Sequence, residues 1–141
     1  MRHRPPRGER GGVALELTLL TPLLLLLLVF VVALGRLAEG RLQVDDAAAQ
    51  AARAATVAAS TGGASAVAQQ AAAASLASDR VTCSQLTVST DTSSFVPGRS
   101  VRVQVSCAVS LSDLSLLHLP GTETLIGVAT SPVDRFRSVA P

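Results

Sequence analysis

The residue types that most often perform catalysis are sparse in this chain of 141 residues. Only two histidines occur, His3 and His118. Serine is abundant, but the Gly-x-Ser-x-Gly pattern of a nucleophile elbow is absent, and one histidine outside the N-terminal tail does not make a triad. The sequence also lacks a phosphate loop, a dinucleotide fingerprint and a Cys-x-x-Cys motif. We therefore expect no catalytic residue, no cofactor, no small-molecule substrate and no enzymatic activity.

The two cysteines, Cys83 and Cys107, offer two kinds of chemistry. One is metal binding together with His118. The other is a disulfide, which persists where a protein is exported to an oxidising compartment. Both cysteines follow a segment that predicts export, as described below, so we expect the disulfide and no metal site.

One long apolar run dominates the N-terminal third of the chain. No residue from Leu17 to Gly35 is charged, and six consecutive leucines occupy residues 23–28. At about 1.5 Å per residue, a helix over this run spans about 28 Å, which is close to the hydrocarbon thickness of a bilayer. Pro22 removes one backbone hydrogen bond and is expected to kink the helix. The run predicts a single membrane-spanning helix.

The charges beside this run predict its orientation. Four arginines and a single acid, Glu9, lie within residues 1–11, and arginine and acidic residues are balanced after the run. By the positive-inside rule the N-terminus stays in the cytoplasm and the last hundred or so residues are exported. The basic tail has no Lys and no neighbouring aromatic residue, so we expect no nucleic-acid partner.

The residues alone also allow two other interpretations of the apolar run. Ala33-Leu34-Gly35 resembles a weak cleavage site, so the run is alternatively a removable secretory signal of a secreted binding protein. The other alternative is a plain single-pass anchor that is never processed.

Glu16 is the unusual residue of this segment because it places a carboxylate beside the apolar run. An acidic residue inside a bilayer is costly, by roughly 2.5–3.5 kcal/mol at a helix centre and by less near an end. Either Glu16 snorkels to the membrane interface, or it meets a positive partner within the bilayer.

The order of residues around Glu16 resembles a known signal. Residues 10–17 read Arg-Gly-Gly-Val-Ala-Leu-Glu-Leu, followed by Thr21-Pro22 and the leucines. This is similar to the class III signal of bacterial type IV prepilins, and most closely to the TadE-like minor pseudopilins of the Flp (Tad) pilus. Gly35-Arg36-Leu37 and the alanine-rich residues 44–55 add to the resemblance, which covers roughly residues 10–56. Leu17 departs from the aromatic residue that the family often has after its glutamate.

The resemblance implies a structural rather than a chemical role. A prepilin peptidase would cut after Gly11, which makes Gly12 the first residue and Glu16 the fifth, as in the family; a cut after Gly12 would make Glu16 the fourth. Glu16 would then be an assembly contact. The partners implied are membrane lipid, prepilin peptidase and other pilin or pseudopilin subunits. After removal of the leader, the expected protein is a minor pseudopilin that lies in the cell membrane and can be incorporated into the pilus.

Beyond the membrane the sequence predicts an alanine-rich helical region over residues 36–78 with a break at 61–63. Alanine favours helix at almost no cost in side-chain entropy. Polar residues recur three or four positions apart, which predicts one polar stripe along a helix: Arg36, Glu39, Gln43, Asp46, Gln50 and Arg53. The opposite face is mostly small and suits close packing in a pilus-like bundle. A solvated linker helix is the alternative.

From residue 81 onward the apolar residues alternate with a period of two. Residues 100–109 predict a half-buried strand, residues 81–90 its partner, and residues 122–130 a third strand. Val96-Pro97-Gly98-Arg99 provides a turn between the first two strands. If Cys83 lies opposite Cys107 in an antiparallel pair, facing residue numbers sum to 190, and Asp91 faces Arg99.

These patterns together predict an α+β protein. Residues 1–11 are expected to form a basic prepilin-type leader, 12–35 the membrane helix, 36–78 the alanine-rich helical region, and 79–141 a small exported β domain. We expect the sheet to pack against the alanine-rich helix. The leucine-rich residues 114–121 are either core beneath the sheet or a subunit contact.

Overall fold

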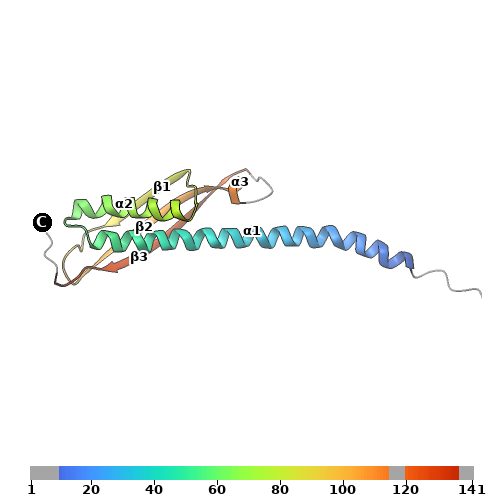
Figure 1. The fold of residues 1–141 in the computed structure, drawn as a ribbon, viewed down its shortest axis with the longest axis horizontal. Coiled ribbons are helices and arrows are strands. Elements are labelled where there is room, and N and C mark those ends of the chain that lie inside the picture. The colour runs from blue at the N-terminus through green and yellow to red at the C-terminus, as the bar shows by residue number, and fades with distance from the viewer. Residues whose placement is uncertain (1–9, 115–119, 137–141) are drawn as a thin grey trace, which may run out of the picture.

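The computed structural model describes residues 10–114 and 120–136. A long helix, α1 (Arg10–Thr56), is followed by α2 (Thr61–Ser78), and then by β1 (Gln85–Asp91), β2 (Ser100–Ser110), the short α3 (Leu111–Leu114) and β3 (Thr122–Pro132). Figure 1 shows α2 and the three strands gathered along the C-terminal part of α1, while the N-terminal part of α1 projects away from them. The predicted α+β class is confirmed.

Helix α1 has 47 residues and is therefore about 70 Å long. It continues through Pro22, where the hydroxyl of Thr21 donates a hydrogen bond of 2.7 Å to the carbonyl oxygen of Leu17. The predicted membrane-spanning part and the alanine-rich part are thus one helix. Their connection contains Gly35 and Gly40 but no break in the helix.

The break between the two helices lies earlier than the predicted residues 61–63. Helix α1 ends at Thr56, and Thr61-Gly62-Gly63 form the first turn of α2. Ser60 is the N-cap, and its hydroxyl oxygen accepts a hydrogen bond of 3.2 Å from the backbone N–H of Gly63. The prediction treated the two glycines as breakers, whereas the capping serine before them starts a new helix.

The sheet is antiparallel with strand order β1-β2-β3. The three strands fall close to their predicted positions, although the first begins at Gln85 rather than at Val81. The predicted register is wrong. Leu86, not Cys83, faces Cys107, and Asp91 faces Arg102 rather than Arg99. Because Cys83 lies before the first residue of β1, its bond to Cys107 does not define which residues of β1 and β2 face each other.

The observed register resolves a conflict in the predicted one. Facing residues in β1 and β2 sum to 193, so Leu86 and Val88 lie on the same face as Val105 and Cys107. A sum of 190 would have turned Leu86 and Val88 to the outer face. Both are half-buried, and residues 101, 103, 105, 107 and 109 of β2 are buried as predicted.

The connection between β1 and β2 contains the predicted turn. Gly98 has a φ of +80°, and the N–H of Arg99 donates to the carbonyl oxygen of Val96 over 3.1 Å. This backbone fits a type II turn with Pro97 at its second position and glycine at its third. At the start of the same connection, hydrogen bonds from Ser93 hold the pKa of Asp91 below its usual value.

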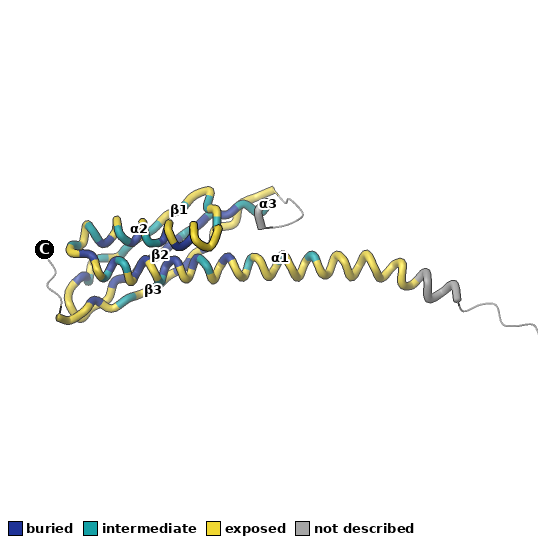
Figure 2. The backbone as a smooth tube through the Cα atoms, in the orientation of Figure 1, coloured by how far each residue is buried: buried dark blue, intermediate teal, exposed yellow. Residues whose placement is uncertain are grey.

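The core consists of one face of α1, one face of α2 and the inner face of the sheet (Figure 2). Its buried residues on α1 are valine and alanine: Val44, Ala47, Ala48, Ala51, Ala52 and Ala55. The polar stripe on the opposite side of α1 is exposed except for Gln43, which is half-buried. The small-residue face is therefore filled within the chain, which corrects the expectation of a face free for a pilus bundle and excludes a solvated linker.

Gly127 marks the closest approach of β3 to α1. A Cβ added there would lie 2.5 Å from the carbonyl oxygen of Val44 and 2.9 Å from the Cα of Asp45. Both atoms belong to the helix backbone and cannot rotate away. One turn earlier, a Cβ on Gly40 would lie 3.2 Å from the Cδ1 of Leu125. Glycine on the strand and small residues on the helix together allow this contact.

The predicted disulfide is present. Cys83 and Cys107 are bonded, with their Cα atoms 5.3 Å apart and a sequence separation of 24. Cys107 lies in β2 and is fully buried, whereas Cys83 lies in the connection from α2 to β1. The bond therefore ties the entrance of the sheet to its central strand.

We predict that Gly127→Ala destabilises the domain formed by α2, the sheet and the C-terminal part of α1 by about 1–3 kcal/mol, because the added methyl group forces the backbones of β3 and α1 apart. Calorimetric unfolding of the purified protein in detergent measures this change. Gly62→Ala is the matched control, because a Cβ there meets nothing within 4 Å and alanine favours the helix. Equal unfolding temperatures for the two variants would contradict the close contact.

We predict that replacing both Cys83 and Cys107 by alanine lowers the free energy of unfolding by about 3–4 kcal/mol, the chain-entropy value for a loop of this length. Before that comparison, thiol labelling followed by mass measurement tests the bond itself. The native protein should take up no label until a reductant is added. Labelling of both cysteines without reductant would show that the bond is absent.

Candidate functional site: the projecting part of helix α1

The projecting part of α1 carries a continuous apolar surface. Leucines from residue 17 to residue 34 are exposed; Leu19, for example, is 69% exposed and Leu26 65%. The described residues contain one helix that is long and apolar enough to span a membrane, and its apolar window is not buried within the chain. Exposed apolar surface of this extent marks a membrane or protein contact. The helix supports a membrane location.

The predicted processing residues, Gly11 and Gly12, lie in the first turn of α1. The helix thus begins at Arg10, where the basic tail ends. Glycine is a poor helix former, so this first turn gains little from its own residues. A turn of low intrinsic stability is suited to opening in a protease site.

Glu16 lies one helical turn after Gly12 and is exposed. Residues four apart share a face of a helix, so an amine created at Gly12 and the Glu16 carboxylate would lie on the same side of α1. Glu16 makes no ion pair with another residue in the described parts of the chain.

The remaining candidates from the sequence do not join this segment. Cys83 and Cys107 are far along the chain and bonded to each other. His118 lies outside the described residues, as do His3 and most of the leucine-rich residues 114–121. Within residues 10–114 and 120–136, no group of three or more His, Cys, Asp or Glu side chains could hold a metal ion.

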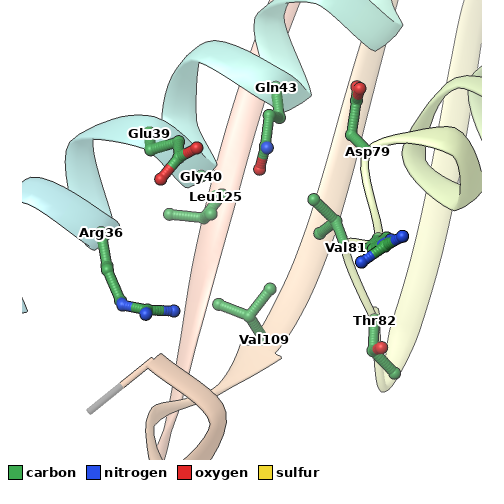
Figure 3. A pocket seen from close by; sticks show the side chains of 10 residues that line it. Arg36, Glu39, Gly40, Gln43, Asp79, Val81, Thr82, Val109 and Leu125 are labelled. Atoms are coloured by element: carbon green, nitrogen blue, oxygen red, sulfur yellow. The ribbon is translucent and has the colours of Figure 1, made fainter.

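The sequence did not indicate a cavity between α1, the segment after α2 and the sheet (Figure 3). It is lined by α1, by the segment that follows α2 and by two strands, and it contains Arg36, Glu39, Asp79 and Arg80. These charged residues come from two segments about 40 residues apart in sequence, so no local motif announces them. In the sequence, Arg36 and Glu39 stand out only as members of the polar stripe of α1.

In a comparison with family models, residues 11–53 match the model described as TadE-like protein. Comparison with curated proteins and with solved structures gives no match. The matched residues begin at the predicted processing glycine and cover almost the whole of α1 (Arg10–Thr56). The resemblance that the sequence indicates is therefore confirmed over this helix, and residues 11–53 are a TadE-like segment.

Proposed function

We propose that this protein is a minor pilin or pseudopilin of a Flp (Tad) pilus or a related secretion apparatus. Prepilin peptidase cleaves the basic leader after Gly11, α1 holds the protein in the cell membrane, and the domain formed by α2 and the sheet is extracytoplasmic. The protein performs no chemistry of its own. It acts through contacts with membrane lipid and with other pilin subunits, and it requires no cofactor.

The observation that carries this proposal is the coincidence of the family match with α1. The TadE-like segment of residues 11–53 supports a role associated with the Tad pilus. The helix over the same residues has an exposed apolar half and a half that forms the core of a folded domain. A membrane helix that continues into a small domain is the arrangement expected of a pilin-like subunit.

Charge and the disulfide support the proposed orientation. The arginines precede the apolar helix, which favours a cytoplasmic N-terminus. The Cys83–Cys107 bond lies C-terminal to the apolar run, on the side opposite the arginines along the chain. Such bonds persist in oxidising compartments rather than in the cytosol. Both features favour export of the domain.

The mature N-terminus separates this proposal from its alternatives. Cleavage by prepilin peptidase leaves Gly12 as the first residue. A removable secretory signal would instead leave a residue near Arg36, and a plain anchor would retain Met1. Intact-mass measurement of the protein from its native membrane distinguishes the three outcomes.

We predict that Gly11→Val leaves the uncut precursor in the membrane, because a branched side chain obstructs a peptidase site that accepts glycine. Immunoblotting and intact mass of the membrane fraction measure the precursor. Gly12→Val is the matched control and should still be cut. Normal processing of Gly11→Val together with a block in Gly12→Val would place the cut after Gly12 instead.

We predict that Glu16→Ala is inserted and processed but assembles poorly. The carboxylate is proposed to neutralise the amine of Gly12 on a neighbouring subunit, and an unpaired charge in a low-dielectric environment is costly. Cross-linking within the membrane and recovery of sheared pili measure assembly. Asp46→Ala, which removes an exposed acid of α1 beyond the apolar run and outside the cavity, is the control. Full assembly of Glu16→Ala would favour a glutamate that only snorkels to the interface.

A further inference from the structure

The cavity between α1, the segment after α2 and the sheet has a volume of about 310 Å³. Its floor is apolar, formed by Val81, Val109 and Leu125, and its walls carry charged residues. Figure 3 shows the side chain of Arg36 extending from α1 into the space beside Val109. The volume lies at the lower end of the range of ligand sites, roughly 300–1,000 Å³, and fits a small polar group.

Two positive and two negative side chains line the cavity: Arg36, Arg80, Glu39 and Asp79. None of them makes an ion pair or a side-chain hydrogen bond with another residue in the described part of the chain. Opposite charges that share a cavity without pairing remain free to bind a ligand that carries both signs.

Arg80 occupies a backbone position that normally selects glycine. Its φ is +58°, and it is the only residue other than glycine with positive φ among the described residues. The N–H of Val81 donates to Leu76 and that of Arg80 to Ala77, which is the Schellman pattern at the end of a helix. An arginine there costs backbone strain that glycine would avoid, and it places a guanidinium at the cavity.

The cavity lies at the membrane end of the domain if the proposed function holds, and the inference rests on that function. Arg36 is the first residue after the apolar run and hence lies at the level of the lipid headgroups. Figure 1 shows α3, next to the end of β2, at the end of the domain that faces the apolar part of α1. Val109, which lines the cavity, is near that end of β2.

We propose that this cavity binds the headgroup of a zwitterionic phospholipid that carries a primary ammonium, of the phosphatidylethanolamine class. Arg36 and Arg80 bind the phosphate, for which a guanidinium offers paired donors. Glu39 and Asp79 accept hydrogen bonds from the ammonium. A purely anionic headgroup or free phosphate would face two uncompensated carboxylates, and a choline headgroup has no N–H to donate.

Native mass spectrometry of the full chain, extracted from vesicles of equal parts phosphatidylethanolamine, phosphatidylcholine and phosphatidylglycerol, tests the proposal. One phosphatidylethanolamine should remain bound in preference to the other two lipids. Arg80→Gly should reduce its retention about tenfold, the effect of losing one charge-assisted hydrogen bond. The same variant should unfold about 2–4 °C higher because glycine relieves the strain. Arg53→Gln, which removes an exposed arginine on the far part of α1, should change neither.

Each other outcome overturns the proposal in an identifiable way. Equal retention of phosphatidylglycerol or phosphatidylcholine, or unchanged retention in Arg80→Gly, would show that the four charges do not select the headgroup. Displacement of the lipid by inorganic phosphate would assign the cavity to free phosphate. A chain that fails to float with the vesicles after an alkaline wash would contradict the proposed function, whereas a chain that floats but retains no lipid would contradict this inference alone.

Discussion

Helix α1 and strand β3 approach each other so closely that the backbone of Val44 occupies the place where a Cβ of Gly127 would be. The rest of the domain is arranged around this contact. Alanine on α1 lets α2 pack beside it, and the valines of β2 cover the remaining space. With Phe95 as the one buried aromatic side chain described, the core depends on closeness of packing rather than on bulky residues. Such a core tolerates added volume poorly. The disulfide between Cys83 and Cys107 adds stability that the few large side chains of the core do not provide.

The same constraint links the domain to the membrane. Helix α1 is continuous from the exposed leucines to the buried alanines, so one rigid element serves as both the anchor and the core. A domain that was joined by a flexible linker could take any orientation on the membrane surface. Here α1 continues without a break from the exposed leucines into the core, so the sheet packs directly on the helix that carries the apolar run.

Periodicity in the sequence was sufficient to predict the elements but not their exact pairing. The alternation in residues 100–109 predicted the buried face of β2, and the spacing of polar residues predicted the exposed face of α1. The register failed because it assumed that bonded cysteines lie opposite each other, and Cys83 lies before the strand. Leu86 and Val88 are the apolar residues of β1, and placing them on the buried face gives the observed pairing with Cys107 and Val105. An isolated glycine within a strand, such as Gly127, is itself a sequence signal of close backbone approach.

The two candidate sites differ in how far they can be predicted, for a physical reason. Gly11 and Glu16 lie within one short stretch of helix, so their spacing alone defines their geometry. The cavity requires α1, the end of α2 and two strands to come together, and its arginine at residue 80 owes its position to a helix cap. The family match ends at residue 53, just before α1 ends, so what the chain shares with TadE-like proteins is the helix. The cavity is formed where that helix meets parts of the chain outside the match, so the family resemblance could not predict its full set of lining residues.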